Sequence, residues 1–247
     1  MLKLVIAGAG GRMGKTLVAA AEEISGVQLV ATLSRHSGDG DIDTVLSNAD
    51  VLIDFTRPEV TLNYLVICKK HGIKAVIGTT GFSSAQMQQI EGFARDIAIV
   101  LAPNMSIGVN VSLQLVEAAA KALGLDYDIE VFEAHHKMKV DAPSGTALAL
   151  GEVAAKARGQ LLADVATYDR NGISAPRERG SIGFSVVRAG DIIGDHTVFF
   201  AGPGERIEIT HKSSSRATYA QGAMRAAQFL AGKKVGLFDM REVLGLR

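Results

Sequence analysis

The N-terminal stretch LKLVIAGAGGRMG, residues 2–14, decides the fold of this chain. Leu2–Ala7 is a short apolar run, and a glycine-rich turn and a helical pattern through Ile24 follow it. The alternation continues with four more apolar runs separated by helical segments: Gln28–Leu33, Val51–Phe55, Lys74–Ile77 and Ile97–Leu101. Uninterrupted apolar strands between helices are typical of a parallel sheet covered on both faces. With the right-handed crossover rule, the pattern predicts a doubly wound, Rossmann-type α/β fold.

The pattern changes near Met105. We expect a long helix over about Gly108–Leu123, a strand over Tyr127–Phe132 and a helix over Ala147–Ala157. Three strand-like runs without helices between them come next, and a last helix follows them: Ser181–Arg188, His196–Ala201 and Arg206–His211, then about Ser214–Leu230. Strands in direct succession predict a mixed or antiparallel sheet. We therefore expect a dinucleotide-binding domain of residues 1–106 and 217–247 and an α+β domain of residues 107–216.

Composition limits the classes of function. The 247 residues suffice for one large domain or two modest ones, and 47% hydrophobic against 21% charged residues predicts a packed soluble core. Lys+Arg and Asp+Glu both number 26, so there is no basic excess and we expect no nucleic-acid partner. The single cysteine, Cys68, lies in an apolar helical pattern and is expected in the core of a protein from a reducing compartment. The N-terminal apolar run is too short for a signal peptide or a membrane span, so we expect a cytoplasmic protein with no membrane partner.

The glycine-rich turn is a candidate phosphate site. Gly8, Gly11 and Gly14 recur every third residue, with Gly10 in addition, between a strand and a helix. Small residues let the backbone approach a pyrophosphate, and the helix N-terminus offers N–H groups to it. Arg12 could add a charge-assisted contact. The alternative is a tight turn between strand and helix that binds nothing.

The residues after the second strand bear on the cofactor. Ser34 stands where NAD sites usually have an acidic residue, and Arg35 and His36 follow it. A hydroxyl, a guanidinium and an imidazole would accept a 2′-phosphate, so NADPH is at least as well supported as NADH, unless Arg35 is a solvated loop charge. The segments Gly78–Gly81 and Ala102–Ser106 end the fourth and fifth strands and are expected at the same edge of the sheet.

The stretch EAHHKMKVDAPSGTA, residues 133–147, concentrates titratable groups between a strand and a helix. Ser144 is either an ordinary helix N-cap or part of a turn that holds an anion such as a carboxylate. His135 and His136 are neighbours, so on a strand they point to opposite faces, and we expect no metal site. One of them could be a general acid, and Lys139 could hold a carboxylate or donate a proton. A purely structural network is the alternative.

Taken together, these motifs resemble the 4-hydroxy-tetrahydrodipicolinate reductase (dihydrodipicolinate reductase) family of diaminopimelate and lysine biosynthesis. The resemblance covers nearly the whole chain and rests on seven motifs in the family's order: AGAGGRMG, IDFTRPE, VIGTTGF, NMSIGVN, EAHHKMKVDAPSGTA, GFSVVRAGDIIGDHTVFF and ERIEITHKSSSR. The motif with adjacent histidines and the Pro-Ser-Gly-Thr turn is highly specific, whereas the glycine loop alone is not.

The resemblance implies reduction of a small cyclic dicarboxylate with loss of water, using NADPH, NADH or both. It assigns proton transfer to His135 and Lys139, and substrate binding to His136, Ser144, Gly145 and Thr146. The residues implied in cofactor binding are Gly8, Ala9, Gly10, Gly11, Arg12, Met13, Arg35, Gly78, Thr79, Thr80, Ala102, Pro103, Asn104 and Met105. Residues 107–216 would then be a substrate-binding and tetramerisation domain, and the protein a homotetramer.

Two departures from the family pattern concern the cofactor. The segment of residues 34–50 looks shorter than the family's, and Ser34 replaces an acidic residue that many relatives carry, which should weaken selection for NADH. Two other functions stay open at this point. One is a different nicotinamide-dependent dehydrogenase of a small carboxylate, and the other is a non-catalytic dinucleotide sensor.

Overall fold

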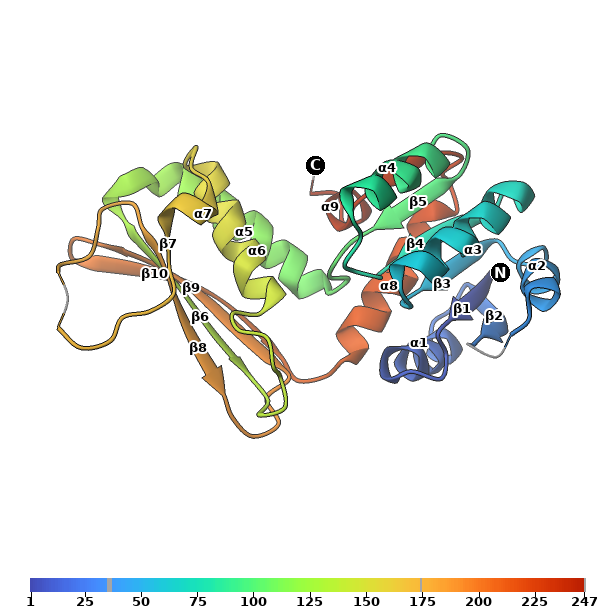
Figure 1. Cartoon of the computed structure of the whole chain (residues 1–247), viewed down its shortest axis with the longest axis horizontal. Coiled ribbons are helices and arrows are strands. Elements are labelled where there is room, and N and C mark those ends of the chain that lie inside the picture. Colours follow the sequence, from blue (N-terminus) through green and yellow to red (C-terminus); the bar gives the residue numbers. More distant parts are fainter. Residues whose placement is uncertain (35–36, 174, 247) are drawn as a thin grey trace. The chain divides into compact units, whose positions relative to one another are not determined.

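The computed structural model describes residues 1–34, 37–173 and 175–246, and the chain divides into two units (Figure 1). Unit 1 consists of Met1–Ile107 and Arg216–Arg247, and unit 2 of Gly108–Ser215. The C-terminal segment therefore belongs to the same unit as the N-terminal glycine loop. Within the described ranges, no helix has the length and apolar character that a membrane span requires.

Unit 1 is built on a six-stranded sheet in the order β11-β5-β4-β3-β1-β2, in which each neighbouring pair is parallel. Its strands are β1 (Leu2–Ala7), β2 (Val27–Leu33), β3 (Val51–Asp54), β4 (Lys74–Ile77), β5 (Ala98–Leu101) and β11 (Gly236–Phe238). Its helices are α1 (Arg12–Glu23), α2 (Asp39–Leu46), α3 (Pro58–His71), α4 (Ser84–Phe93), α8 (Ala217–Leu230) and α9 (Met240–Val243). The predicted doubly wound, Rossmann-type fold is confirmed.

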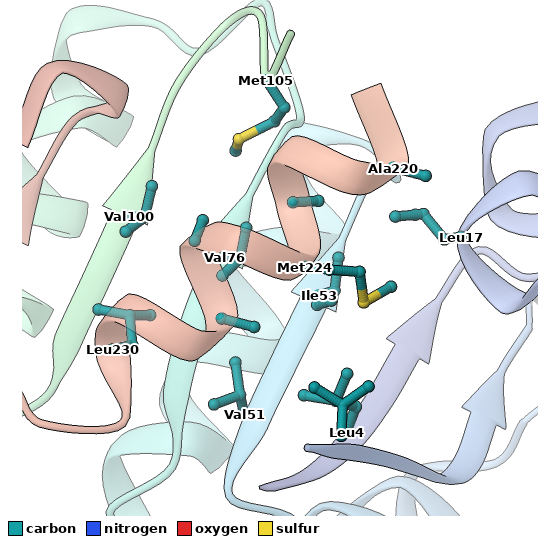
Figure 2. Packing of buried hydrophobic residues seen from close by; sticks show 14 of the residues in the cluster. Leu4, Leu17, Val51, Ile53, Val76, Val100, Met105, Ala220, Met224 and Leu230 are labelled. Carbon is teal, nitrogen blue, oxygen red and sulfur yellow. The ribbon is translucent and has the colours of Figure 1, made fainter. Parts of the chain in front are cut away.

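Successive side chains of a strand point to opposite faces of the sheet, and both faces of this sheet are covered. Leu4 and Ile6 of β1 pack with residues of α1, α8 and α9, whereas Val5 and Ala7 pack with residues of α2, α3 and α4. Figure 2 shows the first cluster, in which side chains of α8 such as Met224 lie over the strands. Burial on both sides explains why the strands read as unbroken apolar runs.

Unit 2 contains a five-stranded mixed sheet in the order β10-β9-β6-β8-β7 (Figure 1). Its strands are β6 (Asp128–His135), β7 (Ala166–Thr167), β8 (Ile182–Arg188), β9 (Gly194–Gly202) and β10 (Glu205–Ser213). β6 is parallel to β8 and antiparallel to β9, which confirms the expected mixed sheet. The helical elements are α5 (Ile107–Leu123), the short 3-10 helix Gly124–Asp126, α6 (Gly145–Ala157) and α7 (Leu162–Val165).

The expectation that β6 ends at Phe132 was wrong, because the strand continues to His135. As the central strand, β6 pairs with β8 as far as His135 and with β9 as far as Ala134. Two ladders hold the polar end of the strand in extended form. As a result, Glu133 and His135 lie on the same face, two residues apart.

One face of this sheet packs against α5 and α6. Val131, Val198 and Phe200 form a buried cluster there with Ala120 and Leu150 of the two helices. The opposite face carries the alternate residues of the same strands, including the half-buried Phe132 and Phe199 and the exposed Val187. At the end of β6, Glu133 and His135 lie on this same helix-covered face.

Candidate active site

A cleft of about 580 Å³ opens in unit 1 beside the carboxyl ends of β1 and β3. The residues that line it come from the glycine turn, the end of β2 and the segment that starts α3: Gly8, Gly10, Gly11, Ser34, Phe55, Thr56, Arg57, Val60 and Tyr64. The glycines and Ser34 were predicted from the sequence. The five lining residues from 55 to 64 were missed, although the motif that follows the third strand was the signal that could have found them.

Glycine is required at two points of this turn. Gly8 has a φ of +76°, a backbone conformation that side chains disfavour, and a β-carbon on Gly14 would lie 2.1 Å from the Gly8 carbonyl oxygen. Inside the turn, the N–H groups of Gly8 and Ala9 donate to the Leu33 carbonyl. Gly11, the N-cap of α1, has no side chain that could cap the first helical turn, and a helix N-terminus of this kind can bind an anion. The geometry therefore fits a dinucleotide pyrophosphate.

A buried carboxyl group underlies the cleft. The hydroxyl of Thr56 donates to Asp54 at 2.6 Å and that of Thr61 at 2.5 Å, and the backbone N–H of Thr56 reaches both Asp54 and Thr79 Oγ1 at 3.0 Å. Burial raises the pKa of Asp54, against the lowering effect of the bonds from Thr56 and Thr61. This network ties the ends of β3 and β4 together and fixes Thr56 in the cleft wall. A β-carbon on Gly78 would lie 2.2 Å from the ring of Phe55, so glycine there makes room for that ring.

The other expected cofactor residues follow β4 and β5 at the same edge of the parallel sheet, but several of their side chains belong to the core. Thr79 and Ala102 are buried, and the Met105 side chain is 1% exposed within the cluster that also includes Met13. Such residues could contact a dinucleotide through their backbone groups. Arg35 lies outside the described residues.

In unit 2, the carboxylate of Glu133 contacts residues from the end of β6, the end of β8 and the start of α6. Glu133 Oε2 lies 2.6 Å from His135 Nδ1. The Arg188 guanidinium donates to both carboxylate oxygens, from Nη1 to Oε2 at 2.7 Å and from Nη2 to Oε1 at 2.8 Å. The backbone N–H of Ser144 donates to Oε1 at 2.9 Å. Burial raises the pKa of Glu133, but the bonds from Arg188, His135 and Ser144 outweigh it and hold the pKa below 4.5.

A second histidine completes this cluster. His196 of β9 places Nε2 3.0 Å from Ser144 Oγ, and its ring meets the His135 ring edge to face at 5.1 Å. Burial, followed by the nearby His135, lowers the pKa of His196 to about 4, so it is neutral at pH 7. Gly194 precedes it on the same strand, and a β-carbon there would lie 3.1 Å from His135 Nε2. Glycine thus leaves space beside the ring nitrogen of His135 that Glu133 does not engage.

The loop after β6 carries the remaining candidates. Lys139 Nζ donates to Asp141 Oδ2 at 2.8 Å, and this bond lowers the pKa of Asp141. His136 is half-buried just beyond the strand, and its carbonyl accepts from the Lys139 N–H at 3.1 Å. Ser144 is the N-cap of α6, since its hydroxyl accepts from the Ala147 N–H at 3.1 Å.

The structure thus brings His135 and Ser144 into one cluster and pairs Lys139 with Asp141. Sequence reasoning missed Glu133, Arg188, Gly194 and His196. Glu133 had a signal in the quoted motif, because a carboxylate two residues before a histidine on a strand faces the same way. The other three come from strands far along the chain, inside the quoted motif of residues 183–200, which did not show that they meet the end of β6. Among residues 1–34, 37–173 and 175–246, no group of three His, Cys, Asp or Glu side chains could hold a metal ion.

Comparison with known proteins adds an independent line of evidence. The N-terminal family model of dihydrodipicolinate reductase matches residues 2–105, and the C-terminal model matches residues 108–244. A 4-hydroxy-tetrahydrodipicolinate reductase of Nitrosospira multiformis is 55% identical, with 100% of this chain and 98% of the relative covered. One of Ralstonia nicotianae is 53% identical over 99% of this chain and 100% of the relative.

A solved structure has the same fold over its whole length. The dipicolinate-bound dihydrodipicolinate reductase of a Paenisporosarcina species superposes with a TM-score of 0.80 at 25% identity, covering 98% of each chain. Homology is shown by two family models that together span nearly the full sequence and by relatives above 50% identity. The chain belongs to the dihydrodipicolinate reductase family.

Proposed function

We propose that this protein reduces 4-hydroxy-tetrahydrodipicolinate, a small cyclic dicarboxylate, to tetrahydrodipicolinate with loss of water. The observation that carries the proposal is the cluster in unit 2, where His135 lies beside the N-terminus of the 13-residue helix α6. A proton donor next to an anion-binding helix end suits a carboxylate-bearing substrate. The activity named for the relatives and the dipicolinate bound to the solved homologue support the same substrate class.

The substrate carboxylates are assigned to the turn at α6 and the loop before it. Gly145 and Thr146 begin α6, and the positive end of the helix dipole there favours a negatively charged group, so both are assigned to one carboxylate. The hydroxyl of Ser144 and the imidazole of His136 are assigned to the same task. Lys139 adds positive charge for the second carboxylate, and its present partner Asp141 is more than half exposed and thus easily exchanged for a substrate group.

Proton delivery is assigned to His135 and Lys139. Once the 4-hydroxyl has left as water, a bound nicotinamide cofactor would supply a hydride to substrate C4. Electron density then rises on the substrate ring, and a proton from a positioned acid neutralises it. His135 is mostly buried, and its Nε2 lies beside Gly194, which has no side chain to obstruct it. Lys139 stabilises the same developing charge through its ammonium group.

For the cofactor, we propose that NADPH serves at least as well as NADH. Support comes from Ser34 in the cleft wall, from the neighbouring Arg35 and from the exposed Arg57, which lines the same cleft. Among the described residues, the cleft lining has a hydroxyl and a cation but no carboxylate, which suits a 2′-phosphate better than a free ribose 2′-hydroxyl. The glycine turn from Gly8 to Met13 and the backbone of residues 78–80 and 102–105 are assigned to the dinucleotide.

The homotetramer remains a prediction. The helix-free face of the unit 2 sheet carries Phe132, Phe199 and Val187, and apolar groups of this kind on an open sheet face favour association with further copies of the chain. Light scattering at several protein concentrations measures the assembly directly.

A coupled assay tests the activity. Dihydrodipicolinate synthase supplies the unstable substrate from pyruvate and aspartate semialdehyde, and absorbance of the nicotinamide follows its oxidation with NADPH or NADH. We expect oxidation that depends on both synthase substrates. Oxidation with neither cofactor, from folded protein that still binds a dinucleotide, would instead favour another dehydrogenase or a dinucleotide sensor.

A further inference from the structure

Glu133 has an unusual number of partners for a single side chain. Its carboxylate makes four hydrogen-bond contacts, one with His135 Nδ1, one from the Ser144 N–H and two from Arg188, with lengths of 2.6 to 2.9 Å. A carboxylate offers about four lone-pair sites, so both oxygens are saturated. The side chain is 1% exposed, and water has little access to it. Nothing in the proposed reaction so far requires this group.

The saturation of Glu133 has a consequence for the proton on His135. Arg188 and the Ser144 amide are donors only, and both are aimed at an ionised carboxylate. An ionised carboxylate is an acceptor only, so the His135 Nδ1 that lies 2.6 Å away must carry the hydrogen. The neutral imidazole then has its lone pair on Nε2. Nε2 is therefore the atom that gains and loses the exchangeable proton, and it is also the nitrogen beside Gly194.

We propose that Glu133 is a positioning residue that fixes His135 in the Nδ1–H tautomer and ties it to the Ser144 turn, so that the proton donor and the anion-binding helix end keep one geometry. The catalytic consequence rests on the proposed function, whereas the tautomer does not. A carboxylate behind a histidine also stabilises the imidazolium, as the buried aspartate does in serine proteases. Arg188 in turn holds the carboxylate in place through two parallel bonds.

The strands and the loop next to this end of β6 carry further titratable groups. Arg188 of β8 offsets part of the Glu133 charge. His196 of β9 and His211 of β10 are both largely neutral at pH 7, because burial lowers the pKa of each. Lys139 and Asp141, which pair with each other, come from the loop after β6. Glu133 is the one carboxylate among the described residues that bonds to the His135 ring.

The tautomer is measured directly by long-range proton–nitrogen NMR on the full-length, ligand-free protein labelled with ¹⁵N. The chain has six histidines, and the His135 signals are assigned as those missing from His135→Gln. We expect the neutral form of His135 to carry its proton on Nδ1. A neutral His135 with its proton on Nε2 would overturn the inference, whatever the activity of the enzyme.

Kinetics test the catalytic part. In Glu133→Gln we expect kcat to fall about 10- to 100-fold, and the alkaline limb of kcat/KM to move about one pH unit lower, because the imidazolium loses its anionic partner. The dissociation constant of NADPH should change less than about threefold, since that cleft lies in unit 1. Glu130→Gln is the matched control, because Glu130 is on the same strand and pairs with Arg170 and Arg177.

We expect Glu130→Gln to keep the wild-type kcat and pH profile. A Glu133→Gln enzyme that also keeps them would overturn the inference. A wild-type enzyme without substrate-dependent oxidation would refute the proposed function instead, and the tautomer measurement would still decide the role of Glu133. That measurement uses the wild-type chain, so it remains decisive if Glu133→Gln does not fold.

Discussion

The hydroxyl of Ser144 lies 3.0 Å from Nε2 of His196, although the two residues are 52 positions apart in the chain. The same hydroxyl accepts from the Ala147 N–H and caps α6. When His196 donates from Nε2, the hydroxyl hydrogen of Ser144 is released from the protein and available to a substrate oxygen. Helix capping by Ser144 is thus observed, and we propose that the same residue also binds an anion, the role that the sequence left as the alternative.

Ser144→Ala separates these roles when it is compared with a second cap. Loss of the N-cap should cost about 1 kcal/mol of stability, and loss of a hydrogen bond to a charged carboxylate should raise the substrate KM roughly tenfold or more. Ser83, the N-cap of α4 with a capping box to Gln86, is the matched control. Ser83→Ala should lose similar stability without a change in KM. Equal KM values for both variants would contradict the role of Ser144 in substrate binding.

Stability should decrease in mild acid because of His196. Its pKa is 6.5 in the unfolded chain and about 4 in the folded protein, where burial disfavours the cation. The unfolded state therefore binds more protons between pH 6.5 and about 4, and stability falls as the pH is lowered through this window, by at most about 3 kcal/mol. Above pH 6.5 this loss is absent.

Glu133 acts in the same direction at lower pH. Its folded-state pKa lies below 4.5, so the stability it contributes is present above that value and is lost as the pH falls through the folded pKa.

The effect of His196 is measured by urea unfolding at a series of pH values between 7 and 4.5. The free energy of unfolding should decrease with falling pH in the wild type, and His196→Gln should make this decrease smaller. Parallel curves for the wild type and this variant would contradict a depressed pKa at His196.

Gly194→Ala should impair turnover by crowding the reactive nitrogen. The new methyl group would lie 3.1 Å from His135 Nε2. Either the imidazole ring must move, or the substrate must bind farther from Nε2. We expect kcat to fall about tenfold or more, because a misplacement of about 1 Å is costly to a positioned acid. Gly92→Ala in α4, where the new methyl group meets no atom within 4 Å, should leave kcat unchanged. Full activity of Gly194→Ala would show that this space is not used.

Asp54→Ala should weaken dinucleotide binding without direct contact. The hydroxyls of Thr56 and Thr61 would lose their buried acceptor, which costs roughly 2 kcal/mol of stability, and Thr56 would no longer be held in the cleft wall. Calorimetry should show an increase in the NADPH dissociation constant of about tenfold. Asp50→Ala, which removes an exposed bond to the Lys3 N–H, is the control. Wild-type affinity in Asp54→Ala would contradict the positioning role.

Most of the fold could be predicted from the sequence, because a parallel sheet covered on both faces demands apolar runs that are easy to recognise. β1 and β4 were predicted with their exact bounds for this reason. β11 was missed, since its three residues are too few to form a pattern and only pairing with β5 makes them a strand. The extension of β6 to His135 was missed because its polar residues are held by neighbouring strands, not by their own propensity.

The candidate site was predictable only as far as it is local in the chain. His135, Lys139 and Ser144 share one motif of fifteen residues and were named from it. Arg188 bonds to Glu133 and His196 to Ser144 because β8 and β9 pair with β6. The register of that pairing cannot be read from the spacing of the residues in the sequence. For Asp54, the two bonding partners Thr56 and Thr61 are near in sequence, but the link of both to Thr79 after β4 depends on the pairing of β3 with β4.

The turnover of His135→Gln in the coupled assay tests the account most directly. Substrate-dependent NADPH oxidation by the wild type should fall about 10²- to 10⁴-fold in this variant, and Lys139→Ala should show a comparable loss, as expected for positioned proton donors. The NADPH dissociation constant and the unfolding midpoint, measured on the same samples, should stay near the wild-type values. Wild-type turnover in both variants, with the fold intact, would contradict the assignment of the chemistry to the cluster at the end of β6.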